Sequence, residues 1–127
     1  VSSDAPGLDI SMPAVAENSP VLRGALRDFL ERLTLTRERM ADIVLAVGEA
    51  TSNAIEHAYR GHEGTVCVRA SATAKRLIIE IHDEGRWRLD SSPERGRGLG
   101  LMRALVDDVA IESTQGGTLV RFEVQLV

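Results

Sequence analysis

The sequence predicts a single α+β domain, and three observations support this fold class. Apolar residues in the first half of the chain recur at three- and four-residue steps, which is typical of amphipathic helices. From about residue 65 they alternate with polar residues, as in strands that bury one face. A length of 127 residues with 43% hydrophobic content is enough for one core, and no internal repeat indicates a second unit.

Two helices are expected before residue 61. Thr36 is a suitable cap for the second helix, which should continue to about Tyr59 and end at Gly61. The first helix follows from an apolar stripe at Leu22, Leu26, Phe29, Leu30 and Leu33.

The remaining elements are mostly strands. Leu8 to Met12 predict a short edge strand ended by Pro13, and "GTVCVRASAT" with "KRLIIEIHD" predicts a hairpin. After it we expect a polar loop over 84–97, a helix over about 99–107, and a final strand pair over 109–113 and 118–126.

Composition excludes several classes of partner. The formal net charge of -4 gives no general attraction to nucleic acid or to anionic membranes, and 3% aromatic residues leave few surfaces for stacking bases. No apolar stretch approaches the length of a membrane span, and the amino terminus lacks a signal-peptide pattern. The single cysteine, Cys67, agrees with a reducing compartment, so we expect a cytoplasmic protein.

Residues 1–7 resemble a linker before a domain over 8–127, and a start at Val1 is compatible with a segment of a longer polypeptide.

Two polar residues lie at the ends of predicted core-facing rows. Counting by two places Asp83 on the face of Leu77, Ile79 and Ile81, and Thr118 on the face of the last strand's apolar residues. A buried carboxylate needs hydrogen-bond donors. Asp83 is therefore either a turn residue opening Asp-Glu-Gly or, with Thr118, part of a pocket for a polar ligand.

A glycine-rich stretch, "GRGLGL" over 96–101, precedes the predicted third helix. Glycines there let backbone N–H groups approach a phosphate, although such a run is often only a flexible connection. It is not a dinucleotide fingerprint, because a long polar loop separates it from the preceding strand, and it is not a P-loop, because the only lysine is Lys75.

The second helix carries Glu49, Asn53 and His57 four residues apart, within "VGEATSNAIEHAY". Residues at i and i+4 project from one face, so Glu49 and Asn53 can address one point. A carboxylate there can accept a proton, and an amide oxygen can join the ligands of Mg²⁺. Taken separately, each residue also fits a solvated helix surface. His57 is expected to be structural, and His62 and His82 show no metal-ligand spacing with it.

In order, the motifs Glu-x-x-x-Asn, Asp-x-Gly, Gly-x-Gly-x-Gly and Gly-Gly-Thr resemble those of the GHKL superfamily, which includes gyrase, Hsp90, histidine kinases and MutL. Within it the chain is similar to the small anti-sigma factor serine kinases of bacteria. "GEATSNAIEHAY" resembles the N box, "DEG" the first glycine box, "GRGLGLMRALVDDVAIE" the second and "GGTLVRFEV" the third. The resemblance covers about 10–127 and implies an α+β two-layer sandwich of the Bergerat type, with helices on one face of a mixed β-sheet.

The resemblance also implies roles for individual residues. Glu49 would be the general base, Asn53 the Mg²⁺ ligand, and Asp83 the acceptor for the adenine amino group of ATP. Thr118 would be a second adenine-side contact. The other nucleotide contacts would come from the glycine boxes, at Gly85, Gly96, Arg97, Gly98, Leu99 and Gly100.

Two features depart from the family pattern. Trp87 occupies the second glycine position of the first glycine box, where it either caps the pocket or fills the underside of the lid. The lid is short and rich in arginine, which suits a triphosphate, a partner-binding loop or a solvated surface alike. The arginines in and beside it are Arg86, Arg88, Arg95, Arg97 and Arg103.

The function that the resemblance implies is an ATP- and Mg²⁺-dependent serine/threonine protein kinase that acts as an anti-sigma factor. Such a protein sequesters a sigma factor and phosphorylates a small antagonist protein, and it is expected to be a homodimer. The alternatives are a non-catalytic ATP-dependent binding module and a regulatory domain of a larger fused polypeptide. Glu49 favours the kinase, because a pure binding site has no need of a base.

Overall fold

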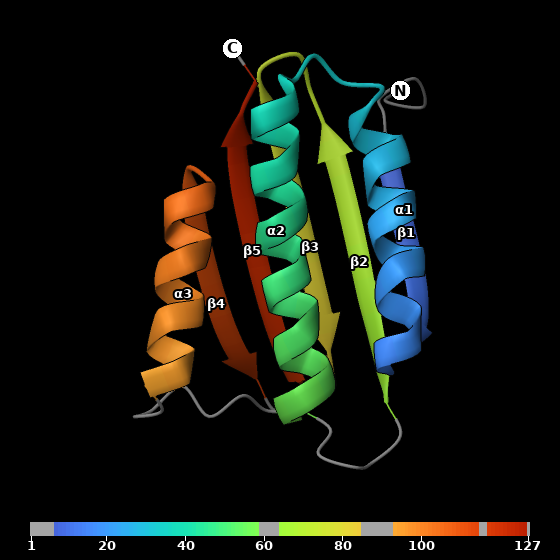
Figure 1. The fold of residues 1–127 in the computed structure, drawn as a ribbon, viewed down its shortest axis with the longest axis vertical. Coiled ribbons are helices and arrows are strands. Elements are labelled where there is room, and N and C mark those ends of the chain that lie inside the picture. The colour runs from blue at the N-terminus through green and yellow to red at the C-terminus, as the bar shows by residue number, and fades with distance from the viewer. Residues whose placement is uncertain (1–6, 59–63, 85–92, 115–116, 127) are drawn as a thin grey trace.

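The structure of the protein is a computed structural model that describes residues 7–58, 64–84, 93–114 and 117–126 (Figure 1). Short 3₁₀ and π-helical turns lie at Ala16–Asn18 and Ala54–Ala58. The helices are α1 (Ser19–Leu30), α2 (Arg37–Asn53) and α3 (Pro93–Leu105), and the strands are β1 (Gly7–Pro13), β2 (Thr65–Ala72), β3 (Arg76–Asp83), β4 (Asp108–Thr114) and β5 (Gly117–Gln125).

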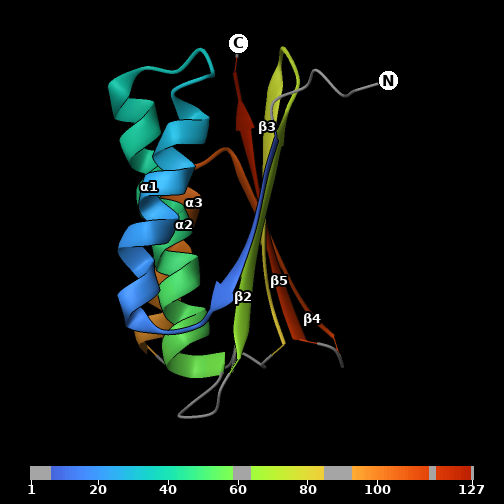
Figure 2. The same cartoon turned by 90° about the vertical axis from the view of Figure 1, so that its right-hand side faces the viewer.

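The described elements form two layers. All three helices cover one face of the sheet, and no described element covers the other face (Figure 2). This arrangement confirms the expected α+β sandwich. Among the helices of the described part of the chain, none combines the length and apolar character that crossing a bilayer requires. Residues 1–6, most of the expected linker, lie outside the described residues, and Gly7 already belongs to β1.

The sheet has the order β1-β2-β3-β5-β4, and each of its four strand pairings is antiparallel. The expectation of a mixed sheet is therefore wrong for the described strands. The connection through α3 explains why the expectation failed. β3 and β4 both run antiparallel to β5, so these two strands point the same way. A helix between two such strands usually joins parallel neighbours, but here β5 lies between them and pairs with both.

The core forms where the helix stripes meet the inward faces of the strands. The predicted stripe of α1 is buried at Leu22, Leu26, Phe29 and Leu30, whereas Leu33 lies beyond the helix end and is only partly buried. The inward row of β3 is equally buried at Leu77, Ile79 and Ile81. Cys67 is half-buried on the opposite, uncovered face of β2.

The second helix begins as predicted. The Thr36 hydroxyl oxygen accepts a hydrogen bond from the Arg39 N–H at 3.0 Å, which satisfies one of the free donors of the first turn. After Asn53 the backbone continues as the π-helical turn over Ala54–Ala58. The expected end near Tyr59 and Gly61 lies outside the described residues.

The third helix begins earlier than expected, at Pro93 rather than near Leu99, and ends at Leu105 rather than Asp107. Three glycines in 96–100 weaken the helical signal of the sequence, because glycine is a poor helix former. Proline is favoured at the first helical position, which explains the observed start. Residues 93–97, which were expected to be loop, are helical.

A polar junction connects α2, α3 and β5 at the end of the molecule where α2 begins. Arg39 Nη2 lies 2.5 Å from Asp107 Oδ2, and Arg39 Nη1 donates to the Leu105 carbonyl oxygen at 3.2 Å. The same Asp107 oxygen accepts from the Gln125 N–H at 2.6 Å. Asp107 thus fixes the carboxyl-terminal end of α3 against both neighbours.

We expect Asp107→Ala to lower the free energy of unfolding by about 1–2 kcal/mol, because two hydrogen bonds to a partly exposed charged acceptor are lost. Urea unfolding followed by circular dichroism measures this change. Asp108→Ala is the matched control, since Asp108 is exposed and makes no side-chain hydrogen bond or ion pair with other described residues. Equal effects of the two substitutions would contradict the role of the junction.

Candidate functional site

Asp83 and Thr118 lie directly opposite each other in the antiparallel pair of β3 and β5. Asp83 is 1% exposed and Thr118 is fully buried, although both are polar. They end the inward rows of their strands, next to the apolar pair Ile81 and Val120. The prediction that these two side chains face the core is thereby confirmed.

The start of β5 lies very close to the end of β3. Gly117 has φ +137°, a conformation that favours glycine. A Cβ atom on Gly117 would lie 1.9 Å from the carbonyl oxygen of Asp83 and 2.7 Å from the Cα of Glu84. Glycine is therefore required for Thr118 to lie in register with Asp83.

Glu49 and Asn53 lie one turn apart in the last turns of α2, and both side chains are half-buried. Successive residues of an α-helix are about 100° apart, so positions i and i+4 differ by about 40° around the axis. Their position on one side of α2 agrees with the sequence prediction. Glu49 also lines a groove between α1 and α2.

The candidate site residues come from elements that meet at one end of the molecule. The carboxyl-terminal ends of α2 and β3 and the amino-terminal ends of α3 and β5 all lie at the lower end of Figure 1. α2 contacts both β3 and α3. The fold therefore brings the end of α2 that carries Asn53 to the end of the sheet that carries Asp83 and Thr118.

The second glycine box lies within α3. The backbones of Gly96, Arg97 and Gly98 are helical, and so are those of Leu99 and Gly100. Leu99 is half-buried and Gly100 is exposed. The glycines that were expected to let backbone N–H groups approach a phosphate are thus the fourth, sixth and eighth residues of a helix, whose amino-terminal end favours negative charge.

Some predicted site residues fall in the part of the chain that the structure does not describe. Gly85 and Trp87, and the side chains of Arg97 and His57, lie outside the described residues. His82 is exposed on the uncovered face of the sheet, opposite Cys67 in register. Within 7–58, 64–84, 93–114 and 117–126, no group of three or more His, Cys, Asp or Glu side chains has the arrangement of a metal site.

The arrangement suits a ligand that offers a hydrogen-bond donor to a buried carboxylate. The exocyclic amino group of adenine is such a donor, and Thr118 beside Asp83 adds a hydroxyl group that can donate or accept. The amide oxygen of Asn53 is the type of ligand that Mg²⁺ accepts alongside phosphates and waters. The residues present therefore fit a magnesium nucleotide.

Two features of the site were missed by the sequence prediction. Gly117 was not identified as a site residue, although the Gly-Gly-Thr sequence before a strand was a usable signal. The groove between α1 and α2 had no signal in the sequence, because it depends on which surfaces of the two helices adjoin.

Comparison with known proteins agrees with this geometry. The family described as histidine kinase-like ATPase domain matches residues 12–124. An anti-sigma F factor from Caldanaerobacter subterraneus is 31% identical, with 90% of each chain covered. A serine-protein kinase RsbW from Bacillus pumilus is 30% identical, with 88% of this chain and 82% of the relative covered.

A solved structure gives the same result. The crystal structure of the RsbU and RsbW domains of a Mycobacterium tuberculosis protein is similar with a TM-score of 0.79 and 28% identity. The match covers 95% of this chain but only 32% of that chain. The similarity thus extends over nearly the whole of this sequence.

We expect Gly117→Ala to lower the free energy of unfolding by at least about 2 kcal/mol, because a non-glycine residue at this φ is strained and its Cβ would overlap the backbone of β3. Thermal and urea unfolding measure the change. Gly24→Ala is the control, since Gly24 is helical with open space around it and should gain stability. An unchanged stability of Gly117→Ala would contradict the close approach of β3 and β5.

Proposed function

Because the chain belongs to the histidine kinase-like ATPase family, we propose that it is an ATP- and Mg²⁺-dependent protein serine/threonine kinase that acts as an anti-sigma factor. The observation that carries the proposal is the buried pair of Asp83 and Thr118 at the end of the sheet that α2 reaches with Asn53. The names of the relatives, anti-sigma F factor and serine-protein kinase, support the choice of kinase within the family.

In this proposal each polar residue has a separate task. Asp83 accepts a hydrogen bond from the adenine amino group, and Thr118 provides a second contact beside it. Asn53 would hold Mg²⁺, which neutralises phosphate charge when bound. The backbone of α3 over 96–100 would bind the phosphates, and Gly85, which the family resemblance also implies as a nucleotide contact, lies outside the described residues.

Glu49 is the group that makes the site catalytic. The seryl oxygen of the substrate forms a bond to the γ-phosphorus of ATP while its proton passes to the Glu49 carboxylate. The bond between the γ-phosphorus and the oxygen bridging to the β-phosphate breaks, and ADP leaves with that electron pair. Glu49 is half-buried near the end of α2 and makes no hydrogen bond or ion pair with other described residues, so its oxygens are available for this proton.

The partners in this proposal are a sigma factor, a small antagonist protein as the phosphate acceptor, and a second copy of the chain. Apolar surface for dimerisation is available on β1 and α1. Val21 of α1 is 59% exposed, and Leu8, Ile10 and Met12 of β1 are only partly buried.

We expect Asp83→Asn to weaken ATP binding by about 10-fold or more. The carboxylate acceptor is lost, and the amide of the new asparagine can turn its own N–H donor toward the adenine amino group, which is also a donor. Isothermal titration calorimetry with ATP and Mg²⁺ measures the affinity. Glu80→Gln on the uncovered face of β3 is the control and should bind like the wild type. Unchanged affinity of a folded Asp83→Asn protein would remove Asp83 from the nucleotide site.

We expect Glu49→Gln to lower the rate of phosphotransfer by about 10²- to 10⁴-fold, because the general base acts only as the hydroxyl group attacks. The affinity for ATP should stay within about twofold, since the ground state does not use the base. Transfer from γ-labelled ATP to candidate antagonist proteins measures the rate.

Glu38→Gln, at an exposed position in the first turn of α2, is the control for this experiment. Asn53→Ala should differ from Glu49→Gln by weakening Mg²⁺-dependent ATP binding as well. Wild-type transfer by Glu49→Gln would refute the general base. A wild type that transfers no phosphate but binds a sigma factor more tightly with ATP would instead indicate the non-catalytic binding module.

A further inference from the structure

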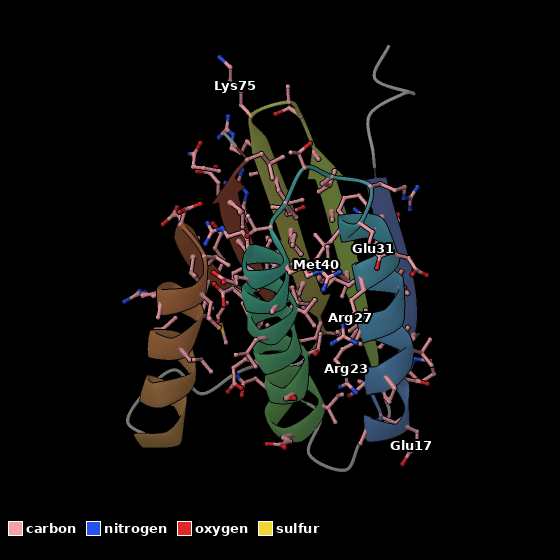
Figure 3. The ribbon with its side chains drawn as sticks, turned by 45° about the horizontal axis from the view of Figure 1, so that its top comes forward. Glu17, Arg23, Arg27, Glu31, Met40 and Lys75 are labelled. Carbon is pink, nitrogen blue, oxygen red and sulfur yellow. The ribbon has the colours of Figure 1, made fainter. Side chains whose placement is uncertain are left out.

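A groove of about 480 Å³ lies between α1 and α2. Arg23 and Arg27 of α1 lie in the space between the two helices, as Figure 3 shows. Glu49, the proposed general base, belongs to the opposite wall on α2. The other lining residues are Ser19, Ala41, Val44, Leu45, Gly48, Thr51 and Ser52.

The arginines of this groove have no partner within the described part of the chain. Arg23 and Arg27 make no ion pair or side-chain hydrogen bond with other described residues, whereas Arg39, Arg69 and Arg76 each have a carboxylate partner. Like charges four residues apart on a helix repel each other. An anionic partner in the groove would relieve this repulsion.

The groove also offers apolar contact. Leu45 is 50% exposed although it is a large aliphatic residue, and the side chain of Val44 forms part of the groove floor with only 6% exposure. Gly48 leaves open space, because a Cβ atom there would meet no atom within 4 Å. A partner that combines carboxylates with apolar side chains therefore fits this groove better than a phosphate backbone, which would meet the two arginines but not the apolar surface.

Spacing indicates the conformation of that partner. Arg23 and Arg27 are four residues apart, or about 6 Å along the helix axis. Alternate residues of an extended chain are about 6.6 Å apart and point the same way. Carboxylates at alternate positions of an extended segment can therefore meet both arginines.

The position of Glu49 links this groove to the proposed reaction. α1 and α2 run in opposite directions, so the amino-terminal end of α1 lies beside the carboxyl-terminal end of α2 (Figure 1). Arg23 is thus nearer to the Glu49 end of the groove than Arg27 is. A segment bound along the arginines would bring one of its residues to Glu49.

We propose that the groove between α1 and α2 is the docking site for the phosphoacceptor segment of the protein substrate. The groove selects an extended segment in which acidic residues lie two and four positions from the serine. The proposal rests on the kinase function proposed above. Glu49 lies on the boundary of the groove, so it receives the serine there while the nucleotide lies toward Asn53.

The test measures the binding of fluorescent peptides by fluorescence polarisation at low salt, with the full chain and saturating ATP analogue. The probes contain Asp-Ala-Asp-Ala-Ser or the reverse order Ser-Ala-Asp-Ala-Asp, and their counterparts carry lysine for aspartate or alanine for serine. We expect the aspartate peptide of one of the two orders to bind at least about 10-fold more tightly than its lysine counterpart. Replacing the serine by alanine should not change this difference.

Two pairs of variants locate the binding site. The double variant Arg23→Glu with Arg27→Glu should lower the affinity for the aspartate peptide at least about 10-fold. The control is Arg69→Glu with Arg121→Glu on the uncovered face of the sheet. It changes the net charge by the same amount and should leave the affinity unchanged. Gly48→Leu should block the groove, whereas Gly24→Leu on α1 is not in the groove lining and should not. Neither glycine substitution should destabilise its helix, because leucine is a better helix former than glycine and a Cβ atom at either position would meet no atom within 4 Å.

Phosphotransfer to the same peptides separates this proposal from the kinase function. If the rate of phosphotransfer to serine peptides changes neither with peptide charge nor with the arginine substitutions, the docking proposal is overturned and the kinase function stands. Binding in the groove without any transfer would support the docking site and count against the kinase. Absence of binding for every peptide, or equal loss in the control variants, would overturn the docking proposal.

Discussion

The register between β3 and β5 is the constraint on which the candidate site depends. It places the carboxylate of Asp83 opposite the hydroxyl group of Thr118, at the end of two rows that are otherwise apolar. A slip of one residue would turn Asp83 or Thr118 to the uncovered face, because side chains alternate along a strand. Gly117 makes this register possible, since any larger residue would overlap the backbone of Asp83. The chain thus holds a buried carboxyl group at a fixed point, and burying a polar group costs stability unless hydrogen bonds compensate for the loss of water.

The second helix connects this buried pair to the surface. Its buried face packs on the core through Ile43, Val47 and Ala50, and its last turns carry Asn53 toward the end of the sheet. Glu49 lies about 40° around the helix from Asn53 and borders the groove beside α1. In the proposed arrangement, one helix would separate the nucleotide on one side from the protein segment on the other, with the proposed base between them. Arg39, near the first turn of the same helix, fixes α3 and β5 through Asp107 at the opposite end.

Local patterns were sufficient to predict the parts that depend on neighbouring residues. Alternation along β3 and β5 predicted the inward faces of Asp83 and Thr118, helical spacing predicted α1 and α2, and the hydroxyl group of Thr36 predicted the cap. The parts that failed depend on contacts between distant segments. The sequence could not show that β5 lies between β3 and β4, so the sheet was expected to be mixed. The glycines of 96–100 concealed the early start of α3, and the groove of Arg23 and Arg27 exists only because α1 lies beside α2.

The central claim is that α2 divides a nucleotide site from a seryl docking groove, with Glu49 at the boundary. A crystal structure with a non-hydrolysable ATP analogue and Mg²⁺ tests this claim most directly. The account predicts the adenine amino group at the Asp83 carboxylate, the metal ion at the Asn53 amide oxygen, and the γ-phosphate on the side of α2 that carries Glu49. A nucleotide bound away from Asp83, or a γ-phosphate that points away from Glu49, would contradict it.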